Sequence, residues 1–126
     1  MNLDSQTALL EHRRIIRTKS FLKNIYTDFY RYFKKIKIPK GPLVEIGSGA
    51  GFIKEIIPQV ITSDVIKAPD IDKVFFAHKM LFKDNSVAAF FMIDVLHHIK
   101  NPEAALREML RCLKTGGKVI MIEPYN

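Results

Sequence analysis

Residues 43–52 read LVEIGSGAGF, and this stretch decides how the rest of the chain is understood. A short apolar run with one glutamate ends in three glycines at alternate positions, Gly47, Gly49 and Gly51. Glycine permits positive φ angles and the close approach of a ligand, and a helix that follows such a turn presents free N–H groups. The stretch is therefore typical of a buried strand that runs into a phosphate-facing or nucleotide-facing turn.

The glycine spacing excludes two common versions of such a turn. The dinucleotide fingerprint G-x-G-x-x-G would need glycine at position 52, where this chain has Phe52. The P-loop pattern G-x-x-x-x-G-K-[ST] does not occur in the sequence. The ligand of the turn is thus predicted to be neither a dinucleotide nor a P-loop nucleotide.

Outward from the turn, apolar runs alternate with helical patterns, which predicts an α/β fold with a Rossmann-like, mainly parallel sheet and flanking helices. About five strands are expected, at 43–46, 60–66, 73–76, 87–96 and 118–125, with a short helix before Pro58 and a longer one over 101–114. Asn101 and Pro102 suit the start of the longer helix, and Gly116–Gly117 suit its end. Only six residues separate Ile66 from Lys73, too few for a parallel crossover helix. We expect either a loop there or a misplaced third strand.

The chain before the turn has a different character. Apolar residues recur at helical spacing over residues 7–33, with a break near Ser20, and Pro39, Gly41 and Pro42 end the helical pattern. Residues 1–40 hold ten Lys/Arg and three Asp/Glu, whereas residues 41–126 hold ten of each, so the first part carries the whole net charge of +7. We therefore predict a basic helical extension at 1–40 and a ligand-binding domain at 41–126.

The basic extension has three interpretations. It is a solvated amphipathic helix packed over the sheet or the site, a lid or substrate-recruiting element for an acidic acceptor, or a contact with nucleic acid or an anionic surface through residues 13–40. In the third interpretation, the contact surface would include Arg13, Arg14 and Arg17. Charge alone does not choose among the three.

Composition limits the class of protein. At 126 residues the chain is one domain at most, and it has no apolar run near the roughly 20 residues that span a bilayer. The N-terminus lacks the pattern of a secretory signal, and one cysteine, Cys112, excludes an internal disulfide framework. A cytoplasmic location is expected.

Two acids give the turn a more specific meaning. Glu45 stands inside an apolar strand, where burial without a partner is costly. It either faces a cationic ligand group or the glycine turn, or it lies at an edge or in a salt bridge. Asp64 follows nineteen residues later at the end of the next strand, where nucleotide-binding α/β folds hold a ribose diol. The alternative for Asp64 is a turn-forming residue.

Taken together, LVEIGSGAGF, TSDVI and the stretch from AHKM to IEP resemble the class I S-adenosylmethionine-dependent methyltransferases, in particular the methyltransferase type 11 group. The resemblance implies that S-adenosylmethionine is the cofactor. Its methionine part would lie among Glu45, the three glycines and the segment from Asp94 to His97, its ribose on Asp64 and its adenine beside the backbone of Ala77. The full set of cofactor-binding residues that the resemblance implies is Glu45, Gly47, Ser48, Gly49, Gly51, Asp64, Val65, Ala77, His78, Asp94 and Val95.

The sequence departs from that family in two places. Members often carry an acid before the alanine, where this chain has Phe76, so an adenine would pack on a ring without that hydrogen bond. The family's sheet usually has seven strands, and the two last strands, which help to form the acceptor side, are absent from these 126 residues.

His97 is the candidate catalytic base, because it follows the fourth strand and an acceptor that must lose a proton needs one. Packing or pocket lining are the alternatives for His97 and for its neighbour His98. Asp94 either lines the pocket or forms a turn at the end of its strand. A metal site from Asp94 and the two histidines is not expected, since no further cysteine or spaced histidine supports it.

The sequence thus predicts a methyltransferase that transfers the methyl group of S-adenosylmethionine to an unidentified acceptor, a small molecule or another partner. Methyl transfer depends mainly on alignment of donor and acceptor. The alternatives are a non-catalytic cofactor-binding or interaction module, as part of a larger enzyme, and a basic adaptor for nucleic acid or membranes.

Overall fold

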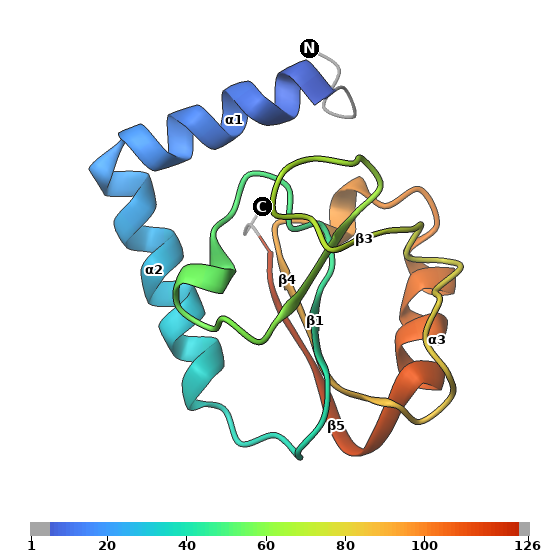
Figure 1. The fold of residues 1–126 in the computed structure, drawn as a ribbon. Helices are drawn as coiled ribbons and strands as arrows, with labels where there is room; N and C mark the ends of the chain where they lie inside the picture. The colour runs from blue at the N-terminus through green and yellow to red at the C-terminus, as the bar shows by residue number, and fades with distance from the viewer. Residues whose placement is uncertain (1–5, 124–126) are drawn as a thin grey trace.

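The computed structural model describes residues 6–123, apart from the side chain of Arg17. Its strands form one five-stranded sheet with helices around it (Figure 1). The strand order is β3-β2-β1-β4-β5, and all four neighbouring pairs are parallel. The Rossmann-like α/β prediction is therefore confirmed. The strands are β1 (Leu43–Glu45), β2 (Ile61–Asp64), β3 (Lys73–Val74), β4 (Val87–Ile93) and β5 (Leu113–Ile122).

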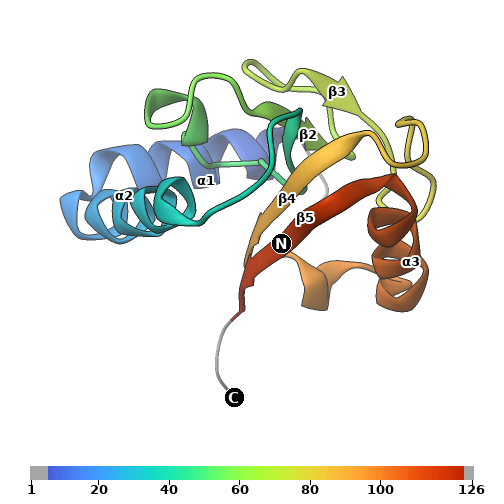
Figure 2. The ribbon, with the colours of Figure 1, turned by 90° about the horizontal axis from the view of Figure 1, so that it is seen from below.

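Helices cover both faces of this sheet. Seen from below, α1 (Gln6–Thr18) and α2 (Ser20–Lys35) lie on one side and α3 (Pro102–Cys112) lies on the other (Figure 2). Alternate residues of β4 face the two sides, so Phe91 packs in the core beneath α2 while Phe90 packs in the core beneath α3. Double coverage explains why β4 is apolar almost throughout. In the described part of the chain, no helix is both long and apolar enough to cross a bilayer.

The N-terminal helices belong to the same packed structure as the sheet. The predicted break occurs at Lys19, one residue before Ser20. Tyr30 and Phe33 of α2 are buried in the core, and the Phe33 ring stacks on Phe91 with centroids 4.7 Å apart. The apolar stripe of α2 thus covers the sheet, while a division into two domains at residue 40 stays a prediction.

Two of the crossovers between strands lack a regular α-helix. After the glycine turn the chain makes only a short 3₁₀ turn, η1 (Ile53–Glu55), because Pro58 follows closely and α2 already covers that face. The short link between β2 and β3 is a loop, and the third strand is correctly placed in parallel register, with Ser63 opposite Lys73. The predicted short helix is therefore wrong, and the loop alternative is confirmed.

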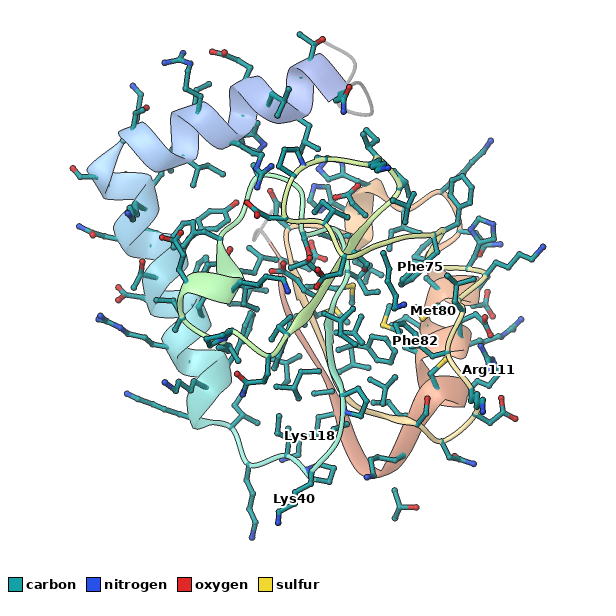
Figure 3. All side chains as sticks on the ribbon, in the orientation of Figure 1. Lys40, Phe75, Met80, Phe82, Arg111 and Lys118 are labelled. Atoms are coloured by element: carbon teal, nitrogen blue, oxygen red, sulfur yellow. The ribbon has the colours of Figure 1, made fainter. Side chains whose placement is uncertain are left out.

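A long connection between β3 and β4 also lacks a helix, and α3 holds it in place. Phe75, Met80 and Phe82 lie toward α3, and Arg111 of that helix lies beside them (Figure 3). The Arg111 guanidinium donates to the carbonyl of Phe82 at 3.0 Å and pairs with Asp84 at 2.7 Å. Apolar packing and one arginine therefore stabilise this segment in place of a crossover helix.

The last helix and strand differ from the prediction at their junction. Asn101 caps α3 as expected, since its Oδ1 accepts from the N–H of Ala104 at 3.1 Å. The helix ends at Cys112, before the predicted end, because Leu113 is already extended and pairs with Val87. The glycine pair thus lies within an irregular start of β5, where Gly116 has a φ of 81°, and does not stop the helix.

Candidate functional site

The carboxyl ends of four neighbouring strands carry four acids at one edge of the sheet. Glu45 ends β1, Asp64 ends β2, Asp94 follows β4 and Glu123 follows β5. Parallel α/β sheets bind their ligands outside this edge. We call these four acids, together with the loops that follow them, the carboxyl edge.

The glycine turn is held tightly between its neighbours. Gly47 and Gly49 have φ angles of 69° and 36°, which glycine adopts without strain. The N–H of Gly49 donates to Asp64 Oδ2 at 2.9 Å, and a Cβ added at Gly47 would lie 2.5 Å from Val95 Cγ2. Predicted cofactor residues from three strand ends therefore lie together, while their contacts with a cofactor stay a prediction.

Ser48 joins the turn to β2. Its N–H donates to the carbonyl of Ser63 at 2.8 Å, and its Oγ accepts from the N–H of Ser63 at 3.1 Å. The side chain is buried. Ser48 therefore shapes the turn, and a role in cofactor binding, which the sequence predicted, would add to that.

Glu45 has an electrostatic environment that suits a ligand. It is 3% exposed, and among the described residues its Oε1 has no hydrogen-bond partner. Burial, together with the nearby charge of Asp64, raises the pKa of Glu45 to about 8, although Ser48 lowers it in part. An edge position is excluded because β1 lies between β2 and β4.

A cavity of about 330 Å³ lies against this carboxylate. Its lining includes Glu45, Ser48, Gly49 and Gly51 from the strand and the turn, with Arg13 reaching in from α1. A buried acceptor without a partner, in a cavity beside glycine backbone, is suited to a ligand that brings its own donors or positive charge.

The predicted adenine side is more open. Ala77 is buried, whereas Val65 is 43% exposed and Phe76 is 59% exposed. The ring of His78 stacks on Phe76 with centroids 5.5 Å apart. A flat aromatic surface therefore stands beside the backbone of Ala77, and the roles of Val65, Ala77 and His78 toward an adenine stay predictions.

His97 lies between two carboxylates. Its Nδ1 is 2.9 Å from Glu123 Oε2, and its Nε2 is 3.4 Å from Asp94 Oδ1. The other Glu123 oxygen accepts from the N–H of Leu96 at 2.7 Å, which fixes the carboxylate. A histidine whose Nδ1 donates to a fixed carboxylate keeps Nε2 as its basic nitrogen. This arrangement suits a general base.

Sequence reasoning missed Glu123, although a signal for it was present. The residue directly follows an apolar strand, and the carboxyl ends of parallel strands meet at one edge. An acid at that position should therefore have been expected next to Asp94.

The ligating atoms of Asp94, His97 and His98 all lie within 4.8 Å of one another, which a metal ion would also require. All three side chains are exposed. Exposed groups of this kind commonly occur without an ion, and the expectation of no metal site stays a prediction.

The N-terminal helices cover the carboxyl edge. A Cβ added at Gly49 would lie 3.3 Å from Leu9 Cδ1 of α1, and the hydroxyl of Tyr30 in α2 accepts from the N–H of Phe52 at 3.1 Å. Tyr26 of α2 has a raised pKa because it is buried and because the charges of Asp94 and Glu45 lie nearby. α2 thus lies close to the ends of both β1 and β4. Leu9, Tyr26 and Tyr30, which lie over the site, were not predicted individually as site residues.

Arg13 belongs to this cover rather than to a basic surface. It is 7% exposed, donates to the carbonyl of Pro69 at 2.8 Å and pairs with Asp70 at 3.1 Å. Arg14 pairs with Glu11 at 2.6 Å. Both arginines therefore have protein partners, and their part in a contact with nucleic acid or an anionic surface stays a prediction.

The fold and the carboxyl edge define a class I methyltransferase-like domain, and comparison with known proteins agrees. Residues 44–121 match the methyltransferase domain family, and the chain belongs to that family. An uncharacterized protein of Methanocaldococcus jannaschii, MJ1123, is 35% identical over 95 residues, which is 69% of this chain and 46% of that protein.

Solved structures show the same fold. A candidate S-adenosylmethionine-dependent methyltransferase from Methanococcus maripaludis superposes with a TM-score of 0.73 at 19% identity, covering 91% of this chain and 62% of that one. A methyltransferase from Thermotoga maritima, described as S-adenosylmethionine-dependent and as a possible histamine N-methyltransferase, gives 0.63 at 29% identity, covering 76% and 50%. The chain therefore spans about half to three fifths of the length of these relatives.

The cofactor that the family implies is S-adenosylmethionine, and the residues present fit it. Glu45 offers a buried acceptor without a partner, and the glycine turn offers backbone that a side chain would otherwise cover. The ligand is cationic at its ammonium and sulfonium groups, and the carboxyl edge supplies four acids. Arg13 and Lys54 also line the cavity, and each is paired with an aspartate, Asp70 and Asp72 respectively.

Proposed function

We propose that this chain binds S-adenosylmethionine at the carboxyl edge and transfers its methyl group to an acceptor that is still to be identified. Glu45 carries the proposal, because its buried Oε1 lies against a cavity and needs a donor or a positive charge from a ligand. Gly47, Gly49 and Gly51 would surround the methionine part, and Asp64 would accept from the ribose hydroxyls. These assignments follow the family resemblance and the placement of the residues.

Transfer of the methyl group depends mainly on alignment. The cofactor supplies an electrophilic methyl on a positively charged sulfur. The acceptor's O, N or C atom forms the new bond to carbon while the C–S bond breaks and its electron pair stays on sulfur, so this chain's task is to orient the two. Where the acceptor loses a proton, His97 Nε2 would take it, and Glu123 would stabilise the resulting imidazolium through Nδ1. Glu123 is a positioning residue in this scheme.

Calorimetry with S-adenosylmethionine tests the cofactor proposal on residues 1–126. Binding at micromolar concentration is expected. A chain that is folded by circular dichroism and shows no binding would contradict it. Glu55→Gln is the matched control for Glu45→Gln, because Glu55 lines the same cavity and is exposed.

Methyl transfer needs a separate test, since binding alone would also suit a non-catalytic module. Radioactive methyl from S-adenosylmethionine should be transferred to a component of a metabolite or protein extract. His97→Gln should lower that rate about 100-fold or more, and leave cofactor affinity within about threefold, if the acceptor must lose a proton. An unchanged rate would remove His97 from the chemistry, and no transfer to any fraction would favour the module.

We also propose a cytoplasmic location. Cys112, the single cysteine, is buried as a free thiol in the core beneath α3, which suits a reducing compartment. Fractionation of cells that express the tagged native gene tests this, and an extracytoplasmic majority would contradict it.

A further inference from the structure

The net positive charge gathers at the end of the molecule opposite the carboxyl edge. The cluster combines the last turn of α2, the linker that follows it and the start of β5. Figure 3 shows Lys40 and Lys118 at this lower end, where β1 and β5 begin. We call it the basic amino edge: Arg31, Lys34, Lys35, Lys37, Lys40, Lys114 and Lys118.

Little negative charge opposes this cluster. Five of its seven members lie in residues 31–40, a stretch that holds no Asp or Glu. These five and Lys118 are exposed, and Lys114 is partly buried. Lys114 Nζ donates to the carbonyl of Lys40 at 2.6 Å, which joins the start of β5 to the linker. Lys40 and Lys114 are therefore neighbours, which places lysines of the linker and of β5 together at this end of the sheet.

A second observation at the same place concerns an apolar cavity of about 300 Å³. Ile36, Ile38 and Pro39 of the linker line it, and Lys34 and Lys40 contribute to its wall. Its other lining is mostly apolar as well, from Phe33, Leu43, Ile57 and Phe91. A volume near the lower end of small-molecule sites, apolar inside and cationic beside the entrance, suits an anionic amphiphile.

We propose that the basic amino edge docks on a bilayer that contains anionic phospholipid, with lysines at the headgroups and the apolar cavity for part of an acyl chain. Exposed Tyr32 on α2, which is 53% exposed, is of a residue type that favours the headgroup level. Clustered lysines attract anionic lipid headgroups electrostatically. The proposal does not rest on methyl transfer, because the carboxyl edge lies at the opposite ends of the strands.

Lipid fits this surface better than nucleic acid does. Binding to single-stranded nucleic acid combines a basic groove with exposed aromatic faces on which bases stack. Here the Phe33 and Phe91 rings are buried against each other, and Tyr32 is the one exposed aromatic ring named on this surface, whereas successive bases stack on several rings. A base also gains nothing from an apolar cavity, whereas an acyl chain does.

Vesicle sedimentation of the full chain tests the proposal. The protein should sediment with vesicles of equal phosphatidylglycerol and phosphatidylcholine, and much less with pure phosphatidylcholine. Raising salt from 50 to 500 mM should release it, because exposed charges are screened. Equal sedimentation with both vesicles, or none at 50 mM salt, would overturn the proposal.

Matched triple variants locate the surface. Lys37→Gln with Lys40→Gln and Lys118→Gln should weaken binding to the anionic vesicles roughly 100-fold, at about fivefold for each lysine near the surface. The control triple, Lys79→Gln with Lys83→Gln and Lys100→Gln, removes the same charge from exposed positions elsewhere and should weaken binding less than fivefold. Equal losses in the two triples would overturn the assignment. Circular dichroism checks that both remain folded.

Two further ligands show whether the surface recognises a phospholipid or only a phosphate group. Dihexanoylphosphatidylglycerol below its micelle concentration should bind at least tenfold more tightly than glycerol phosphate, if the cavity takes an acyl chain. Equal affinity would show that phosphate alone is recognised and would overturn the lipid assignment. Tighter binding of single-stranded RNA than of anionic vesicles at the same salt would also overturn it.

Discussion

The two ends of one parallel sheet carry opposite charge. At the carboxyl edge Glu45 is buried and Asp64 is partly buried, and backbone and helices enclose them. At the amino edge the exposed side chains of Lys34 and Lys40 line an open cavity. Burial makes the charge at the first edge costly and sensitive to its neighbours, whereas water screens the charge at the second. Changes at the carboxyl edge should therefore alter stability and ligand binding strongly, and changes at the amino edge should alter only binding to a charged partner.

The largest effect is expected at Gly47. Gly47→Ala forces an alanine into the left-handed backbone region and places its Cβ 2.5 Å from Val95 Cγ2. It should therefore lower the free energy of unfolding by about 2–5 kcal/mol. Gly116→Ala is the matched control, since its φ is 81° and nothing lies within 4 Å of an added Cβ, and it should cost only about 1–2 kcal/mol.

Adding Val95→Ala to Gly47→Ala separates the clash from the backbone strain. The double variant should recover part of the loss in a urea titration, because it removes the two nearest atoms that the new methyl meets, Cγ1 and Cγ2 of Val95. If Gly47→Ala and Gly116→Ala cost the same, the close packing of the turn against the end of β4 would be refuted.

The second effect concerns ligand affinity. At pH 8.5, Glu45→Gln should weaken S-adenosylmethionine binding about 10- to 100-fold in calorimetry, because a charged acceptor within the cavity is replaced by a neutral one. Glu55→Gln, at an exposed position of the same cavity, should change affinity less than threefold. The cofactor would have to lie elsewhere if both variants kept the affinity of the original chain.

The third effect is a dependence of stability on pH. The pKa of Glu45 is about 8 in the folded chain against 4.5 as its ordinary value, so between these values the folded state binds more protons than the unfolded state. Its contribution to stability is complete below about pH 4.5 and is lost as the pH rises through about 8. The melting temperature should therefore fall from pH 5 to pH 8.5 by several degrees more than it does in Glu45→Gln. Parallel curves for the two chains would show that Glu45 ionises normally.

Sequence and structure agree best where one physical rule dominates. The apolar run of β4 and the glycine turn after β1 were predictable, because double burial and positive φ each demand particular residue types. The Asn101 cap followed from the same kind of local rule. These rules act over a few residues, so the sequence pattern alone reveals them.

The features that escaped prediction depend on tertiary contacts. η1 stands where a helix was predicted, because α2, which is distant in sequence, already covers that face. The Arg13 side chain is buried because the carbonyl of Pro69 and the carboxylate of Asp70 bind it. Glu123 gained its meaning only when β5 brought it 2.9 Å from His97. No local sequence pattern encodes such pairs. The rule that parallel strands end at one edge of the sheet would nevertheless have suggested that Glu123 lies near His97.

The smallest effect is expected at the basic amino edge. Lys37→Gln with Lys40→Gln and Lys118→Gln should change the free energy of unfolding by no more than about 0.5 kcal/mol, since all three side chains are exposed. At 20 mM salt the change should be a gain, because the three lysines add to one positive field, and at 500 mM salt it should vanish. Thermal melts in the two salts measure this. A loss above 1 kcal/mol in both salts would mean that the lysine side chains pack against the fold, and the contrast between the two ends of the sheet would then fail.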